Sequence, residues 1–254
     1  MTAFPARPGL RSLITAAVLL PLALGVAACG KKAAAPAENG APIARIAPPA
    51  GKAWSDQVAF TPEGGYRMGN PNAPIKLVEF GSLTCSHCAE FNAESDADMR
   101  GFVDSGRVSF EFRNFVRDPI DMTTAMLVRC GAPESYFGLT HEAMANQTNV
   151  FDKIKSSGDA AYQQAMALPP AQRFGALARL TGLDTFFAER GLPKAKADAC
   201  LANSATADTL AKSTEEVGQK LEIDSTPTFL FNGEKGPPAT WADVKQRLQA
   251  MGAR

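Results

Sequence analysis

Two cysteines separated by two residues, Cys85 and Cys88, are the part of this chain whose residue types and spacing could do chemistry. Two thiols at this spacing can form a reversible disulfide, and the same spacing also provides half of many zinc sites. A zinc site would need two more ligands, but the other candidates stand alone in the sequence, namely Cys130, Cys200 and His141. The pattern therefore favours a redox-active pair over a metal site.

The residues on either side of the pair indicate where it lies. Residues 75–81 (Ile-Lys-Leu-Val-Glu-Phe-Gly) form a short apolar run, which predicts a buried strand. From Cys88 onward apolar residues recur at helical spacing, so we expect a helix over about residues 88–105. The pair would then lie where a helix begins. The unpaired N–H groups and the helix dipole at that point favour a thiolate at Cys85.

The first part of the chain has the pattern of an export signal. Arg7 and Arg11 precede an apolar stretch, residues 13–28, which ends in small residues. The sequence Val-Ala-Ala-Cys-Gly at 26–30 resembles a bacterial lipoprotein lipobox. This resemblance implies cleavage before Cys29, a lipid on its thiol, and anchoring that could extend to the outer membrane. The alternative is an ordinary signal peptide, residues 1–28, followed by an unrelated cysteine.

Composition and cysteine number narrow the class of protein further. The chain has 254 residues with 26 basic and 26 acidic side chains, so nothing in its charge suggests a nucleic-acid partner. Export would place the protein in an oxidising compartment. If Cys29 carries a lipid, four cysteines remain, and an even number suits disulfides. Cys130 and Cys200 would then form a structural disulfide, or else remain two separate buried thiols.

The order of the predicted elements defines the fold class. Residues 29–53 are rich in Ala and Pro, and we expect them to form a flexible, lipid-anchored tether before a domain at 54–254. Further strands are predicted at 57–60, 66–68, 108–113 and 228–231, and a final helix at 241–251. Between about 119 and 218 the pattern is helical and fits four or five helices. This is the order of an α/β thioredoxin fold with an inserted helical domain.

Two segments make the comparison with a known family specific. Residues 71–88 end in Thr-Cys-Ser-His-Cys, and residues 225–233 read Ser-Thr-Pro-Thr-Phe-Leu-Phe-Asn-Gly. Together they resemble the DsbA-like branch of the thioredoxin superfamily, and the resemblance covers roughly residues 55–254. It implies that Cys85 is the exposed attacking cysteine, that Cys88 is the buried resolving one, and that the Thr226–Pro227 bond is cis and faces the pair.

The resemblance also implies roles for two other residues. His87 occupies the histidine position of the family's Cys-Pro-His-Cys motif, whereas Ser86 departs from its proline. His87 could stabilise the Cys85 thiolate, or it could be a bystander at an exposed helical turn. Glu79 matches the buried acid below the cysteine pair in this superfamily. The alternatives for Glu79 are a position at the solvent end of its strand, or an ion pair with Lys76 or another cation.

These observations predict a lipid-anchored periplasmic enzyme that introduces disulfides into exported proteins through Cys85 and Cys88. Its substrates would be unfolded or partly folded exported proteins that contain cysteines. Its reoxidation partner would be a DsbB-like membrane quinone reductase, and it would need no cofactor of its own. The alternatives are a disulfide isomerase or reductase of the same fold, and a metal-binding or holdase module that uses its thiols as ligands.

Overall fold

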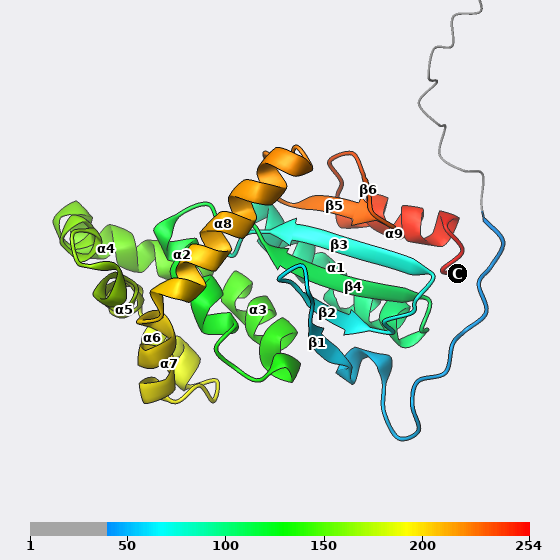
Figure 1. The fold of residues 1–254 in the computed structure, drawn as a ribbon, viewed down its shortest axis with the longest axis horizontal. Coiled ribbons are helices and arrows are strands. Elements are labelled where there is room, and N and C mark those ends of the chain that lie inside the picture. The colour runs from blue at the N-terminus through cyan, green and yellow to red at the C-terminus, as the bar shows by residue number, and fades with distance from the viewer. Residues whose placement is uncertain (1–39) are drawn as a thin grey trace, which may run out of the picture. The chain divides into compact units, whose positions relative to one another are not determined.

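The computed structural model describes residues 40–254, so Cys29 and the signal sequence lie outside the described residues. Six strands form one mixed sheet in the order β1-β2-β4-β3-β5-β6 (Figure 1). At its centre β3 runs parallel to β4 and antiparallel to β5. The strands are β1 (Val58–Phe60), β2 (Tyr66–Gly69), β3 (Ile75–Gly81), β4 (Val108–Asn114), β5 (Thr228–Phe231) and β6 (Glu234–Lys235).

Both faces of β3 are buried. On one face Phe91 of α1 (Ser86–Asp104) lies with its ring centroid 4.6 Å from that of Phe229 in β5 and 5.8 Å from that of Trp241 in α9 (Trp241–Ala250). On the other face Val78 and Phe80 pack in a smaller apolar cluster that also contains Ile223 and Leu230. A central strand buried on both faces explains why residues 75–81 read as a continuous apolar run.

The helical insertion between β4 and β5 is confirmed, but the predicted number of helices is wrong. Residues 119–220 form seven α-helices: α2 (Pro119–Val128), α3 (Tyr136–Ala145), α4 (Gln147–Met166), α5 (Pro170–Thr181), α6 (Leu183–Ala188), α7 (Lys194–Leu201) and α8 (Ser204–Lys220). One missed break is a kink inside α4 at Gly158 (φ 77°, ψ 159°), and the other two contain no Pro or Gly. Asn146 alone separates α3 from α4, and Ala202 and Asn203 separate α7 from α8. Two 3₁₀ turns complete the helical elements (Trp54–Asp56 and Pro133–Ser135).

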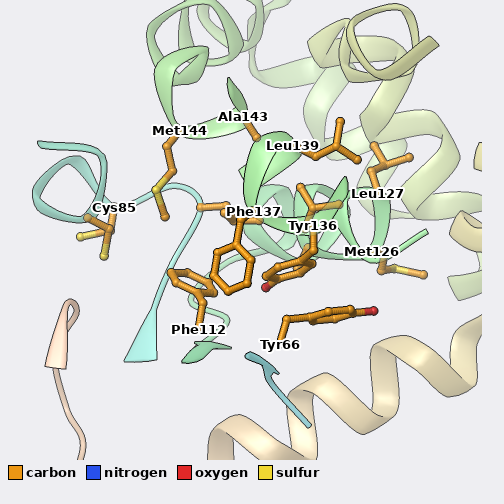
Figure 2. Close-up of a cluster of buried hydrophobic side chains, with 14 of the residues drawn as sticks. Tyr66, Cys85, Phe112, Met126, Leu127, Tyr136, Phe137, Leu139, Ala143 and Met144 are labelled. Atoms are coloured by element: carbon orange, nitrogen blue, oxygen red, sulfur yellow. The ribbon is translucent and has the colours of Figure 1, made fainter. Parts of the chain in front are cut away.

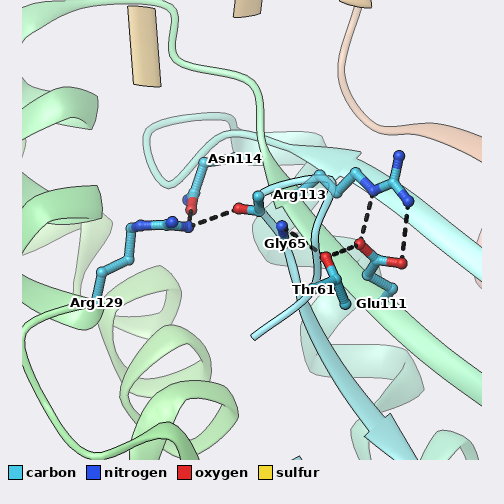
Figure 3. A network of polar contacts seen from close by, with 7 residues as sticks. Thr61, Gly65, Glu111, Arg113, Asn114 and Arg129 are labelled. Carbon is cyan, nitrogen blue, oxygen red and sulfur yellow. Dashed lines mark hydrogen bonds and ion pairs between the residues drawn. The ribbon is translucent and has the colours of Figure 1, made fainter. Parts of the chain in front are cut away.

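Aromatic stacking and a polar network join the insertion to the sheet. Tyr66 of β2 stacks on Tyr136 of α3 (Figure 2). The two ring centroids are 3.8 Å apart. At the end of α2, Arg129 donates hydrogen bonds to the Gly64 carbonyl (3.1 Å) and to Asn114 Oδ1 (3.2 Å), which also accepts from the Tyr136 hydroxyl (3.0 Å). Figure 3 shows Arg129 reaching Asn114 across this junction. The insertion is therefore fixed to the sheet at several points.

The loop between β1 and β2 is held by a carboxylate of β4. Glu111 accepts hydrogen bonds from the Thr61 hydroxyl (2.7 Å) and from Nε of Arg113 (2.7 Å) (Figure 3). Thr61 in turn accepts from the backbone N–H of Gly65 (3.0 Å). These hydrogen bonds compensate the largely buried negative charge of the Glu111 carboxylate.

The folded domain begins earlier than the sequence indicates. The tether is predicted to extend to residue 53, but residues 40–43 run alongside the C-terminal end of the chain, and Ile46 bonds to the residue that follows α1. The backbone N–H of Gly40 donates to the Ala250 carbonyl (2.7 Å), that of Ile43 to Gly252 (2.9 Å), and that of Ile46 to Ser105 (3.0 Å). The Ala- and Pro-rich composition obscured Ile43, whose side chain is partly buried and packs against the core.

A disulfide joins Cys130, just after α2, to Cys200 in α7, across 70 residues of sequence. Replacing both with alanine is expected to lower the free energy of unfolding, because the bond restricts the unfolded chain. The chain-entropy estimate for such a loop is about 4.4 kcal/mol. Urea denaturation of the Cys130→Ala/Cys200→Ala variant measures this change. The redox equilibrium of Cys85 and Cys88 should be unaffected, and equal stability of variant and wild type would contradict the prediction.

Candidate active site

The cysteine pair lies at the N-terminus of α1, on the connection from the end of β3. Cys85 is the N-cap residue, with extended backbone dihedrals (φ −86°, ψ 121°), and Cys88 lies one turn into the helix. Cys88 is fully buried, and Cys85 exposes only 3% of its surface, although Ser86 between them is exposed. The resemblance implied an exposed Cys85. Instead the Thr226 carbonyl lies 3.3 Å from its sulfur, and this contact helps to bury the thiol.

The two thiols differ sharply in acidity. A hydrogen bond from the Cys88 thiol is the largest influence on Cys85 and, against the effect of burial, lowers its pKa to about 4. The Thr226 side chain and the backbone N–H groups of Cys88 and His87 lower it further. The same hydrogen bond, together with burial, raises the pKa of Cys88. The pair therefore holds one proton on Cys88 and a negative charge on Cys85, and the thiolate is the nucleophilic form of a cysteine.

Glu79 lies in β3 and interacts electrostatically with both cysteines. It shares a strand face with Ile75 and Leu77, it is 2% exposed, and its Oε1 has no hydrogen-bond partner in the described structure. None of the ion pairs among residues 40–254 includes Glu79, and Lys76 is exposed. Burial, and secondly the charge of Cys85, raise its pKa to about 8. Glu79 is thus an acid that holds its proton at neutral pH.

The end of β3 has no room for a larger residue than glycine. A Cβ atom at Gly81 would come within 2.4 Å of the Phe112 ring and within 2.9 Å of Glu79 Oε1. Phe112 is the residue of β4 that pairs with Glu79 across the parallel ladder. The Glu79 carboxyl is therefore enclosed by neighbours from its own strand and from β4.

Thr226 contacts the cysteine pair, whereas the His87 side chain does not. The Thr226–Pro227 peptide bond is cis, as the resemblance implies, and Thr226 contacts Cys85. His87 points away from the pair: its side chain is 78% exposed, and its Nδ1 lies 3.7 Å from the Glu90 carboxylate. Only the backbone N–H of His87 acts on Cys85. The structure therefore gives no support to a direct contact between the His87 imidazole and the thiolate.

Sequence reasoning missed three polar residues that surround the connection between β3 and α1. Asp118 and Asp121 at the start of α2 and Gln147 at the start of α4 hydrogen-bond to residues 83–85. The Asp-Pro pair at 118–119 is a helix-start signal that could have identified Asp118 as a cap. Nothing in the sequence around Gln147 distinguishes it from the other glutamines.

The described residues also bear on metal binding and on membrane-spanning segments. Between residues 40 and 254 no three or more His, Cys, Asp and Glu side chains gather in a way that could hold a metal ion. Within the same residues no helix combines the length and the apolar character needed to span a membrane.

The acidity of Cys85 can be measured directly. Ultraviolet absorbance of the reduced protein should show a thiolate that titrates near pH 4, because the Cys88 hydrogen bond stabilises it. In the unfolded chain the thiol has an ordinary pKa near 9. The Cys85 thiolate therefore stabilises the reduced fold fully above pH 9, and this contribution is lost as the pH falls through about 4. Cys85→Ser should remove the transition, and a midpoint above about 7 would contradict the assignment.

Comparison with known proteins agrees with this geometry. The sequence profile of the thioredoxin family matches residues 61–250. The crystal structure of a protein-disulfide isomerase from Novosphingobium aromaticivorans is 35% identical, with a TM-score of 0.69, over 72% of this chain and 95% of that one. Wolbachia pipientis α-DsbA1 is 21% identical, with a TM-score of 0.59, over 74% and 92% of the two chains. The Wolbachia match shows a likeness of fold alone.

Curated relatives point in the same direction. Proteins of Rickettsia bellii and Rickettsia felis, both provisionally named protein-disulfide oxidoreductases, are 23% and 24% identical over 167 residues, or 65% of this chain. The matched region spans about half the length of these relatives, 56% and 52% respectively. The family profile, the paired thiols and the cis-prolyl loop coincide on one site. The chain therefore belongs to the thioredoxin family and has the DsbA-like arrangement, in which a helical insertion interrupts the fold.

Proposed function

We propose that this protein is a thiol–disulfide oxidoreductase that introduces disulfides into exported proteins, with Cys85 as the attacking cysteine and Cys88 as the resolving one. The observation that carries the proposal is the asymmetry of the pair. Cys85 caps a helix and accepts the Cys88 hydrogen bond, so its thiolate is stabilised in the reduced protein. A stabilised reduced form makes the corresponding disulfide a strong oxidant.

The reaction begins with the Cys85–Cys88 disulfide. A substrate thiolate attacks Cys85 Sγ, the bond between the two enzyme sulfurs breaks, and Cys88 leaves and takes up a proton. A second substrate thiolate then attacks the substrate sulfur of the mixed disulfide, and Cys85 leaves as a stable thiolate. The substrate dithiol is oxidised by two electrons, and the enzyme disulfide is reduced to the dithiol.

Glu79 is proposed as the proton donor to Cys88. Cys88 is fully buried and its pKa is raised, so its thiolate is a poor leaving group unless it receives a proton. Glu79 interacts with it electrostatically, has no other partner for its Oε1, and holds a proton at neutral pH. General acid–base catalysis is efficient when the pKa of the group lies near the working pH.

A second function is favoured by one specific observation. The 35% identical structure from Novosphingobium aromaticivorans carries the name protein-disulfide isomerase. An isomerase needs its cysteine pair reduced, whereas an oxidase needs it oxidised. Trapping the thiols in living cells with an alkylating mass tag separates the two: mostly oxidised Cys85 and Cys88 support the oxidase, and mostly reduced thiols support the isomerase or a reductase.

The proposal includes the location and the partners. The lipobox-like sequence before Cys29 supports a lipid anchor facing the periplasm, with the outer membrane as one destination, although that segment lies outside the described residues. Reduced Cys85 and Cys88 would return their electrons to a DsbB-like membrane quinone reductase. Unfolded or partly folded exported proteins with cysteines are the proposed substrates.

Removing one cysteine at a time tests the assignment of roles. Cys88→Ser should accumulate mixed disulfides with exported proteins, because the bond at Cys85 can no longer be resolved from within the enzyme. Cys85→Ser should accumulate none, because Cys88 is fully buried. Non-reducing electrophoresis of the tagged variants measures both. More trapped partner with Cys85→Ser than with Cys88→Ser would reverse the roles and refute the proposal.

Glu79→Gln tests the proton donor. The oxidation rate per substrate thiolate should fall in wild type as the pH rises towards about 8, since Glu79 then loses its proton. The variant should be slower, on the order of 100-fold at neutral pH, and its rate should no longer vary with pH. Stopped-flow exchange between about pH 4 and 9 gives both quantities, with the exposed Glu94→Gln as control. Wild-type rates in a folded Glu79→Gln protein would remove Glu79 from the mechanism.

A further inference from the structure

The connection between β3 and α1 fixes the position of Cys85, and it is only four residues long, from Ser82 to Cys85. Within it, the Cys85 N–H bonds to the Ser82 carbonyl at 3.3 Å, and the Thr84 N–H bonds to Ser82 Oγ at the same distance. These are long hydrogen bonds within one short turn. They leave the backbone groups of Leu83 and the carbonyl of Cys85 to be satisfied from elsewhere.

Residues of the helical insertion satisfy them. Asp121 of α2 accepts the Leu83 N–H at 2.8 Å, and Asp118, the N-cap of α2, accepts the Thr84 hydroxyl at 2.6 Å. Gln147, the first residue of α4, donates from Nε2 to the Leu83 carbonyl at 3.0 Å and to the Cys85 carbonyl at 3.1 Å. The insertion therefore holds this connection from two helices.

Gln147 differs from the two aspartates because it touches Cys85 itself. Gln147 is 9% exposed, and its side-chain amide donates hydrogen bonds to two backbone carbonyls. The Cys85 carbonyl also accepts the first helical hydrogen bond, from Ala89 at 3.1 Å. Two donors on one carbonyl fix the orientation of the peptide unit that joins Cys85 to the helix. An amide does this without placing a formal charge beside the thiolate.

We propose that Gln147 is a positioning residue for disulfide exchange: by holding the Cys85 carbonyl it fixes the sulfur against the hydrogen-bond donors at the start of α1. This inference rests on the proposed role of Cys85 as the attacking cysteine. It gives the helical insertion a part in the reaction, because α4 sets the geometry of the redox pair. Hydrogen bonds from His87 and Cys88 backbone N–H groups depend on that geometry.

The test uses Gln147→Met, which preserves the length of the side chain and removes both donors. In the reduced variant the pKa of Cys85 should rise by about one unit. A shift of that size makes the disulfide tenfold harder to reduce in equilibrium with glutathione, or about 30 mV less oxidising. Gln164→Met, at an exposed position of α4 beyond the kink at Gly158, is the matched control and should change neither quantity.

A second variant keeps the test decisive if Gln147→Met does not fold. Gln147→Asn remains polar, but its amide is one methylene too short to reach both carbonyls, so the pKa of Cys85 and the redox equilibrium should shift in the same direction. If folded Gln147→Met or Gln147→Asn loses stability in urea but keeps the wild-type pKa and equilibrium, Gln147 is merely structural and the inference is overturned.

Failure of the proposed function would look different. If Cys88→Ser in an otherwise wild-type chain traps no partners, then Cys85 is not the attacking cysteine, whatever Gln147 does. If Cys88→Ser traps partners and the two Gln147 variants still behave as wild type in the titration and the glutathione equilibrium, only the positioning role is refuted.

Discussion

The hydrogen bond from Cys88 to Cys85 is the interaction on which the rest of the site depends. Burial alone raises the pKa of a thiol, and both sulfurs are nearly closed to water. The hydrogen bond keeps the proton on Cys88, whose pKa is raised, and stabilises the negative charge on Cys85, whose pKa is lowered despite burial. At the start of the helix the backbone N–H groups of His87 and Cys88 lower the pKa of Cys85 further. One buried pair thus contains a stabilised thiolate and a protonated thiol.

Burial also explains the protonation state of Glu79. A carboxylate in the main core would be strongly disfavoured without a partner, so the group keeps its proton. Its proton and the charge on Cys85 are coupled, because each negative charge disfavours the other. The strand that carries Glu79 is covered on both faces, and the absence of a side chain at Gly81 leaves space for the carboxyl group. The acid is held in place by packing rather than by an ion pair.

The helical insertion contributes to the site as well as to stability. Arg129, Tyr136 and Asn114 join it to the sheet, and Gln147 and Asp121 connect it to the backbone just before α1. Asp121 is itself fully buried, and burial raises its pKa to about 7 although it accepts two backbone N–H groups. The disulfide between Cys130 and Cys200 ties α2 to α7. The disulfide therefore links two parts of the insertion, and polar contacts link the insertion to the sheet and to the backbone of the cysteine pair.

Much of this protein follows from its sequence alone. Local patterns determined the strand at 75–81, the helix that follows the cysteine pair and the presence of a helical insertion, because hydrophobic periodicity acts over a few residues. The tertiary structure decided what depends on residues far apart in the chain. The number of helices depended on single-residue breaks such as Asn146. The start of the domain depended on backbone hydrogen bonds from Gly40 and Ile43 to the C-terminal end. The near-complete burial of Cys85, the outward orientation of His87 and the contacts of Gln147 were also decided there. Gln147 lies 62 positions from Cys85, and no local pattern can specify a hydrogen bond that exists only once two separate helices have packed together.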